Sequence, residues 1–320
     1  MGITIGVDVG GTKIAAGAVD EDGNVLASMR MMTPAGGTDD ITDAIAEVVA
    51  ELRAHKNVPA VDAVGLGAAG FIDRTRSRVL VSPNLNKAWR NEPLRDRVSA
   101  KVNLPVVVEN DANAAAWGEF KFGAGRGLED AIVLTVGTGI GGGLILDRRL
   151  IRGHWGVAAE VGHITAVVGG RRCGCGNRGC WEQYVSGRAL IREAREIASV
   201  EPGRARRLLD LGGGVPEGIL GPHVTLAARE GDGAAREVFD VMGRWLGFGM
   251  ATLAAVLDPG LFIISGGVSE AGDLLIAPTR AAFGELLTGH DARPEAGVVL
   301  AELGNGAGVV GAADLARYLD

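Results

Sequence analysis

One order of elements occurs twice along this chain, and the repeat constrains the fold more than any other feature. Residues 3–9 and 14–19 have the apolar pattern of two strands around a glycine-rich break, and a polar turn at 20–24 leads into a third strand at 25–29. Residues 131–151 repeat the order of strand, glycine-rich break, strand, polar turn and strand. Self-similarity of this kind indicates a duplicated fold. We expect two halves around a cleft, with each glycine-rich break directed into that cleft.

The rest of the chain alternates between strand and helix patterns. Apolar residues recur at helical spacing over residues 39–56, with Thr38 as the expected N-cap and Asp39 and Asp40 in the first turn. We expect strands at 63–69 and 106–109, separated by a loop and an amphipathic helix within 82–101. Residues 186–257 are mostly helical in pattern, and a strand at 261–265 precedes a helix near 271–287. The fold class is therefore α/β, with mixed sheets that carry helices.

Composition excludes some classes of partner. The formal net charge is −7 and no long basic stripe is present, so nucleic acid is not an expected partner. The sequence has neither the pattern of a signal peptide nor that of a membrane span, and we expect a cytoplasmic protein. The three cysteines crowd into residues 173–180, which favours a metal site or reactive thiols over a disulfide framework.

The two glycine-rich breaks have the composition of phosphate-binding loops. The first consists of Gly10, Gly11, Thr12 and Lys13. Unshielded backbone N–H groups, a hydroxyl and one cation suit a phosphate, whereas a plain hairpin turn, the alternative, does not need Thr and Lys at its tip. The second break repeats the device with Gly137, Thr138 and Gly139. Two such loops could hold the β- and γ-phosphates of a nucleotide.

The context of these loops excludes two familiar nucleotide-binding motifs. A Walker A loop has a longer spacing and is followed by a helix, whereas residues 10–13 are compact and continue into an apolar strand. A dinucleotide fingerprint also opens a helix, but the second break runs into the strand at 144–146. A third turn, Gly266 and Gly267, lies between a strand and a helix and suits a nucleoside or its phosphates.

Four residues have the types and spacing of a closed zinc site. They are His163, Cys173, Cys175 and Cys180. Nitrogen and sulfur donors of this kind complete a tetrahedral Zn²⁺ site and leave no position for a catalytic water, so the zinc is expected to be structural. The alternative is a trio of free cysteines beside an unrelated histidine, but free cysteines are usually buried singly in apolar segments.

Candidate ligand-binding side chains lie beside the predicted metal cluster and at the end of one predicted strand. Glu160 and Glu182 flank the predicted metal loop, where a rigid backbone would direct them at sugar hydroxyls; surface glutamates that are simply solvated are the alternative. Asn110 and Asp111 follow a strand at the junction of the halves, where side chains are placed for ligand chemistry. They could equally cap the next helix, residues 112–120.

Taken together, these motifs resemble the ROK family (repressors, open reading frames and kinases) over nearly the whole chain. The matching segments are Asp8-x-Gly10-Gly11-Thr12-Lys13, Glu109-Asn110-Asp111-Ala112-Asn113, Gly137-Thr138-Gly139-Ile140-Gly141-Gly142-Gly143, Glu160-x-Gly162-His163, Cys173-Gly174-Cys175-Gly176 with Gly179-Cys180-x-Glu182, and Ser265-Gly266-Gly267-Val268. Residues 69–73 and 82–85 are most similar to glucokinases of bacterial type.

The resemblance implies an actin-like ATPase fold, related to ribonuclease H, and Mg²⁺-dependent and ATP-dependent phosphorylation of glucose at its 6-hydroxyl. It implies a smaller domain of residues 1–113 plus 305–320 and a larger one of 114–304 that carries the zinc loop, 163–182. Asp111 corresponds to the catalytic base, and the implied sugar-binding residues are Gly70, Asn84, Asn110, Asp111, Glu160, His163 and Glu182. The expected nucleotide contacts are Asp8, Gly10, Gly11, Thr12, Lys13, Gly137, Thr138, Gly139, Gly266 and Gly267. Asp8 is expected to order Mg²⁺ or its waters, and Lys13 to reach a phosphate.

Several alternatives remain open at this point. The substrate could be another hexose, such as fructose, mannose or an N-acetylhexosamine, and the phosphoryl donor could be ATP or polyphosphate. A non-catalytic sugar-sensing regulator is a further alternative; ROK repressors carry a DNA-binding domain ahead of the first phosphate motif, whereas only seven residues precede Asp8. The resemblance also implies a homodimer or homotetramer.

Overall fold

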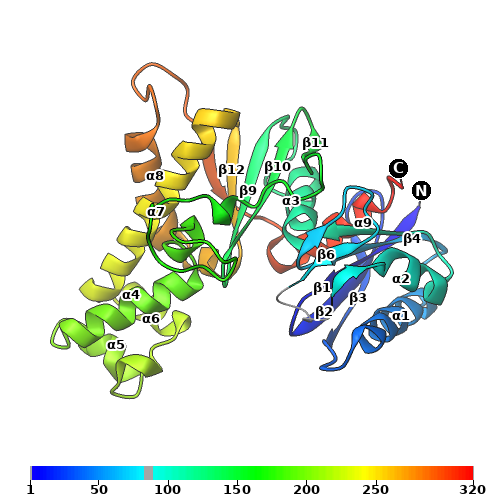
Figure 1. Cartoon of the computed structure of the whole chain (residues 1–320), viewed down its shortest axis with the longest axis horizontal. Helices are drawn as coiled ribbons and strands as arrows, with labels where there is room; N and C mark the ends of the chain where they lie inside the picture. The colour runs from blue at the N-terminus through cyan, green and yellow to red at the C-terminus, as the bar shows by residue number, and fades with distance from the viewer. Residues whose placement is uncertain (1, 83–88, 320) are drawn as a thin grey trace. The chain divides into compact units, whose positions relative to one another are not determined.

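A computed structural model of the chain describes residues 2–82 and 89–319. Asn84, expected in the sugar pocket, lies outside the described residues. The strands are β1 Ile3–Val9, β2 Lys13–Val19, β3 Val25–Met32, β4 Val61–Ala68, β5 Phe71–Ile72, β6 Val79–Val81, β7 Arg90–Glu92, β8 Val106–Asn110, β9 Ala131–Val136, β10 Ile140–Leu146, β11 Arg149–Leu150, β12 Leu261–Ser265 and β13 Gly297–Leu300. The α-helices are α1 Thr38–Ala54, α2 Leu94–Val102, α3 Asp111–Phe122, α4 Gly187–Val200, α5 Arg206–Leu211, α6 Gly221–Arg229, α7 Gly233–Leu257, α8 Asp273–Leu286 and α9 Ala307–Leu315 (Figure 1).

The two five-stranded sheets repeat one strand order. The first runs β3-β2-β1-β4-β8 and the second β11-β10-β9-β12-β13, so each begins with a three-strand meander and continues with two later strands. In the first sheet β1 is antiparallel to β2 and parallel to β4, and β4 is parallel to β8. In the second sheet β10 is antiparallel to β11 and β12 is parallel to β13. The duplication predicted from the sequence is therefore present in the sheets.

The chain forms two compact units whose boundaries differ from the predicted domains. The first unit contains residues 1–132, 143–159 and 301–320, and the second contains 133–142 and 160–300. Residues 114–132 and 143–159, expected in the larger domain, thus group with the N-terminal part. Residues 114–122 do so because α3 packs closely against α9, and Gly143 of β10 in turn lies against Ala116 of α3. As a description of domains, the division at residues 113 and 304 stays a prediction.

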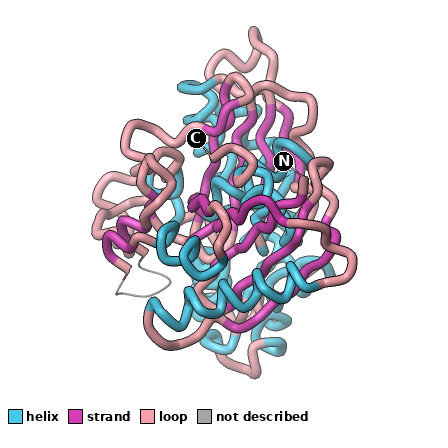
Figure 2. Tube along the Cα trace, turned by 90° about the vertical axis from the view of Figure 1, so that its right-hand side faces the viewer, coloured by secondary structure: helices cyan, strands magenta, loops and turns pink. Residues whose placement is uncertain are grey.

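Helices cover the first sheet and bury a shared apolar core. The apolar residues of α1 with helical spacing face this core, and the largest of them are fully buried: Ile41, Ile45, Val48, Val49 and Leu52. Helix α2 lies beside α1. Figure 2 shows the helices of the chain in cyan and the strands in magenta. The helix begins at Thr38, and Gly37 is its N-cap, which corrects the expected cap by one residue. The Asp40 carboxylate accepts a hydrogen bond from the Gly37 N–H at 2.8 Å, because an acid at the third helical position can satisfy that donor.

Helix α9 and the small sheet β5-β6-β7 have no counterpart in the sequence-based prediction. Helix α9 lies directly on the first sheet, at two glycines. A Cβ on Gly6 would come within 1.9 Å of the Val309 carbonyl oxygen, and one on Gly65 within 1.8 Å of that of Ala312. Only glycine permits this approach of helix to sheet. The termini also meet, since Arg317 donates hydrogen bonds to the carbonyls of Gly2 and Val19.

The second unit contains β12, β13, parts of β9 and β10, and a group of helices. Helix α7 packs along α8, and α4 and α6 also contact α7. Helix α8 carries Pro278 in its interior, and a Cβ on Gly243 of α7 would come within 2.6 Å of the Cβ of this proline. Among the described residues, no helix combines the length and apolar character needed to cross a bilayer.

Candidate active site

The carboxyl ends of β1, β4 and β8 bring several of the predicted residues together in the first unit. These strands are parallel neighbours, and in their register Asp8 pairs with Gly67 and Gly67 pairs with Glu109. Carboxyl ends of parallel strands meet at one edge of the sheet, which is where α/β folds place ligands. Asp8 therefore lies on the edge at which Asp111 begins α3.

Asn110 takes the capping role that sequence reasoning left open. Its Oδ1 accepts a hydrogen bond from the Asn113 N–H at 3.0 Å, and its Nδ2 donates to the Gly70 carbonyl at 3.0 Å. Asp111 is the first residue of α3, and its Oδ1 accepts from the N–H of Ala112 at 2.9 Å. With the cap supplied by Asn110, the carboxylate of Asp111 is not needed for capping and is held in the first turn of the helix.

The electrostatics of this edge favour proton binding. Burial, and after it the negative charge of Asp111, raise the pKa of Asp8 to about 6, although the Lys13 ammonium opposes the shift. Burial also raises the pKa of Asp111, against the hydrogen bonds that its carboxylate accepts from the backbone. A carboxylate with a raised pKa is a better proton acceptor near neutral pH than an ordinary aspartate.

The first glycine-rich loop is a tight turn with an exposed tip. The N–H of Gly10 donates to the Lys13 carbonyl at 3.0 Å, so this N–H serves the turn itself. The hydroxyl of Thr33 donates to the Gly10 carbonyl at 2.6 Å, and the Thr33 N–H donates to that of Thr12 at 2.9 Å. Gly11, Thr12 and Lys13 are exposed. The hairpin expected as the alternative is therefore present, and its tip presents a threonine hydroxyl and a lysine.

The second glycine-rich loop lies against the start of α4. Gly137 donates its N–H to the Gly139 carbonyl at 3.0 Å, and its own carbonyl accepts from the N–H of Gly187, the first residue of α4, at 2.7 Å. Gly266 has φ of +89°, and a Cβ there would come within 2.5 Å of the Val136 carbonyl oxygen. The turns at 137–139 and 266–267 and one helix N-terminus thus gather in the second unit. Helix N-termini attract anions. In the sequence, the N-terminus of α4 is marked by Ser186, a typical N-cap residue ahead of a helical pattern.

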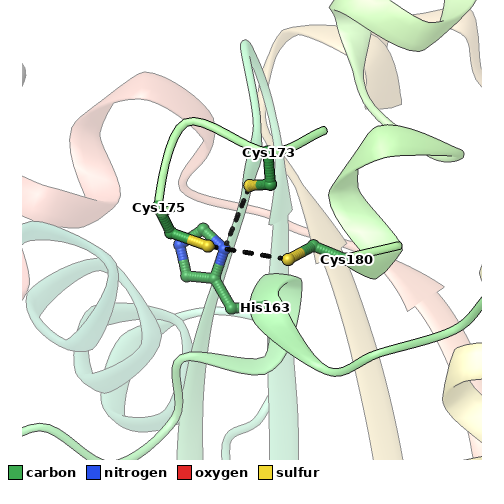
Figure 3. A group of neighbouring side chains, drawn as sticks. All are labelled: His163, Cys173, Cys175 and Cys180. Carbon is green, nitrogen blue, oxygen red and sulfur yellow. Dashed lines mark hydrogen bonds between the residues drawn. The ribbon is translucent and has the colours of Figure 1, made fainter. Parts of the chain in front are cut away.

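The four predicted zinc ligands come together in the second unit (Figure 3). Their donor atoms all lie within 4.8 Å of one another. The Cys173 Sγ is 3.7 Å from the His163 Nδ1, and the Sγ atoms of Cys175 and Cys180 are 3.6 Å apart. Tetrahedral bonds of about 2.3 Å to sulfur and about 2.0 Å to nitrogen place neighbouring donors about 3.5–3.8 Å apart. The donor set and its spacing fit a Zn²⁺ ion.

Both flanking glutamates lie beside this cluster. The Nε2 of His163 is 3.9 Å from Glu160 Oε2, so the ring nitrogen that does not face the thiols points to a carboxylate. The Oε1 of Glu182 accepts a hydrogen bond from the Cys173 thiol at 3.0 Å. A Cβ on Gly139 would come within 2.3 Å of Glu182 Oε2. Glu182 therefore lies between the cysteine cluster and the second glycine-rich loop.

Sequence reasoning gave no role of its own to Glu109, which is 3% exposed. Its Oε2 accepts a hydrogen bond from Arg152 Nε at 2.6 Å, and Arg76 Nε is 3.9 Å from the same oxygen. The only signal in the sequence was a glutamate at the end of an otherwise apolar buried strand. Its two arginine partners are distant in the sequence, which is why no local pattern reveals them.

Comparison with known proteins settles the family. A profile of the ROK family matches residues 4–318. The chain belongs to the ROK family. It is 53% identical to a glucokinase of Streptomyces coelicolor over 320 residues, which is all of this chain and 99% of that protein. The expected family and its closeness to bacterial glucokinases are thus confirmed.

Solved ROK structures share the fold. The crystal structure of a ROK family glucokinase from Streptomyces griseus in complex with glucose and AMPPNP has 53% sequence identity and a TM-score of 0.88, covering 99% of this chain and all of that one. A ROK hexokinase from Thermus thermophilus has 33% identity and a TM-score of 0.83, covering 99% and 98% of the two chains. The predicted fold class, the actin-like ATPase fold of ROK sugar kinases, is confirmed.

Proposed function

We propose that this ROK protein is a glucokinase, which transfers the γ-phosphoryl group of ATP to the 6-hydroxyl of glucose. The observation that carries the proposal is the 53% identity over the whole chain to glucokinases, one of them crystallised with glucose and AMPPNP. The geometry of each unit supports it, because the first unit holds two carboxylates with raised pKa values and the second holds glycine-rich turns at the start of α4, with Glu182 beside the turn at Gly139.

Asp111 is proposed as the general base. It accepts the proton of the 6-hydroxyl as that oxygen attacks the γ-phosphorus, and the bond from phosphorus to the bridging oxygen of ADP breaks. The first turn of α3 holds the carboxylate through Ala112 and the Asn110 cap. Mg²⁺ bound with ATP supplies charge compensation for the phosphates, and Asp8 is the carboxylate suited to order it or its waters.

The exposed tip of the first loop and the turns of the second unit are proposed to hold the phosphates and the nucleoside. Lys13 supplies a cation and Thr12 a hydroxyl at the first tip. Because the N–H groups of Gly10 and Gly137 are engaged within their own turns, the donors to phosphate come from their neighbours in each loop. The start of α4 adds the positive end of a helix dipole in the second unit.

The residues proposed to contact the sugar are Asn110, Gly70, Glu160, His163 and Glu182. Zn²⁺ at the cysteine cluster would bind His163 through Nδ1 and fix the ring, so that Nε2 is directed to a sugar hydroxyl or to Glu160. With the ion bound, Cys173 would be a thiolate that no longer donates to Glu182 Oε1, which would leave this oxygen free to accept from another donor. The proposed role of the zinc is therefore structural, and the side chains around it make the contacts with the sugar.

A coupled assay of ADP release against a sugar panel tests the proposal. We expect turnover with ATP and glucose that exceeds turnover with fructose, mannose and N-acetylhexosamines by at least about tenfold. A kinase for another hexose would reverse that order, and a sugar-sensing regulator would bind glucose without releasing ADP. The same assay with polyphosphate in place of ATP identifies the donor, and sedimentation equilibrium tests the proposed homodimer or homotetramer.

A further inference from the structure

The buried carboxylate of Glu109 joins two parts of the first unit that are distant in the sequence. Its Oε1 accepts hydrogen bonds from the Asn110 N–H and from Asn113 Nδ2, both at 3.1 Å. These two residues flank Asp111 in the first turn of α3. Its Oε2 accepts the 2.6 Å bond from Arg152, which follows β11. One oxygen thus holds the turn and the other is held by an arginine.

The arginines that face Glu109 are not equivalent. Arg76 uses its terminal nitrogens elsewhere, because they donate to the carbonyls of Leu315, the last residue of α9, and of Tyr318 beyond it. Its Nε is 3.9 Å from Glu109 Oε2, which is beyond hydrogen-bond distance. Arg152 makes the direct contact, and its side chain is one quarter exposed. The orientation of the Glu109 carboxylate therefore depends on Arg152.

We propose that Glu109 is a positioning residue for the proposed kinase reaction: oriented by Arg152, it fixes the first turn of α3 and thereby the carboxylate of Asp111. A buried carboxylate without its partner turns toward another cation, because an uncompensated buried charge is costly. Without Arg152 the remaining cation is Arg76, on the Oε2 side, and a turn toward it draws Oε1 away from Asn110 and Asn113. A displacement of about 1 Å at a catalytic group costs on the order of 100-fold in rate.

Two single variants and their combination test this role. In Arg152→Met the carboxylate loses its direct partner, and in Glu109→Gln an amide N–H₂ faces the Arg152 donor. We expect each variant to lower kcat by about 10- to 100-fold, with the Kd for glucose within about threefold of the wild type. In the double variant the carbonyl of the introduced amide can accept from Asn110 and Asn113 with no facing arginine. The double variant should therefore be at least about tenfold faster than the product of the single effects predicts.

Controls separate positioning from a general loss of buried charge. Glu119, which lies in α3, is another buried glutamate, and its carboxylate accepts three backbone N–H bonds, from residues 124, 302 and 303. Glu119→Gln should lower the melting temperature and leave kcat per folded molecule within about threefold. Arg152→Lys keeps a cation near Glu109 and should recover part of the rate lost in Arg152→Met. Because Arg152 is partly exposed, the comparison of Arg152→Met with Arg152→Lys remains informative even if Glu109→Gln does not fold.

The inference rests on the proposed function, and the two can fail separately. If the wild type does not phosphorylate glucose, or if Asp111→Asn keeps its turnover, the proposed function or its base is wrong. If the wild type is active and Asp111→Asn is not, then Arg152→Met with kcat within threefold of the wild type overturns the role of Glu109. Strictly multiplicative effects in the double variant would overturn it as well.

Discussion

Asp8 lies in β1 and Asp111 is the first residue of α3, yet the charge of Asp111 is, after burial, the second cause that raises the pKa of Asp8. The two carboxylates therefore share one electrostatic environment at the edge of the sheet. Lys13 opposes the shift from the tip of the first loop. Such pairs are common where an active site must collect cations and protons. Separate substitutions at the two positions should therefore have different effects on catalysis and on stability.

Replacement of Asp111 by asparagine removes the proposed base and keeps the shape of the side chain. We expect kcat to fall by about 10²- to 10⁴-fold, because general-base catalysis contributes on this scale, while the Kd for glucose changes by less than about threefold. Stopped-flow and steady-state assays measure the two quantities. Asp43→Asn, at an exposed surface pair with Lys101, is the matched control and should behave as the wild type. Near-normal turnover of Asp111→Asn would exclude this base.

The pH dependence of unfolding tests the environment of Asp8. Its pKa is about 6 in the folded protein and near 3.8 in the unfolded chain, so the folded state binds the proton more tightly. Burial of the ionised form then lowers stability above pH 6, and this penalty disappears below pH 4, where both states are protonated. Asp8→Asn should raise the free energy of unfolding at pH 7.5 by at most about 3 kcal/mol, and the gain should shrink as the pH falls from 6 to 4.

Urea unfolding of Asp8→Asn and the wild type at pH 7.5 and 4.5 measures this difference. The control Asp43→Asn should change the free energy of unfolding by less than about 0.5 kcal/mol at either pH. An equal gain for Asp8→Asn at both pH values would contradict the assignment. The same variant should lose activity, since a destabilising buried charge is retained where function needs it.

Removal of zinc should destabilise the second unit. Elemental analysis should find one zinc per chain, and a chelator or His163→Ala should lower the melting temperature by several degrees, because binding energy at a structural site is folding energy. The released thiols should become reactive toward a disulfide reagent, with the exposed Cys175 first. His290→Ala, at an exposed histidine outside the cluster, is the control. Full thermal stability in a zinc-free protein would contradict a structural role.

Introduction of a methyl group at Gly139 should disturb Glu182. A Cβ at this position would lie 2.3 Å from Glu182 Oε2, so Gly139→Ala should displace the carboxylate and raise the KM for glucose by about tenfold or more. Gly174→Ala is the control in the same unit, because no atom lies within 4 Å of its added Cβ. Equal kinetics for the two variants would show that Glu182 does not contact the sugar.

The sequence predicted most of the elements that have a local pattern. The glycine-rich breaks, the polar turns and the helical spacing of Ile41 to Leu52 are all short-range signals, and the corresponding elements are present. The cysteine spacing likewise predicted the cluster with His163. These features were accessible because each depends on residues close in sequence.

Features that depend on tertiary contacts were not predicted. Helix α9 is built almost entirely of small and apolar residues, so it lacks the polar face that marks a helix in sequence. The N-cap at Gly37 was missed because a glycine cannot supply a side-chain cap and Asp40 supplies the bond instead. The link between Glu109 and Arg152 spans 43 residues, and only the folded chain brings them together.

Helix α9 also bears on how the protein is synthesised. It is made of residues near the C-terminus, yet it covers Gly6 and Gly65 of strands that leave the ribosome first. Packing of the first sheet is therefore incomplete until α9 has been translated, and a ribosome-stalled fragment that ends before residue 307 should expose that sheet surface to chaperones and proteases.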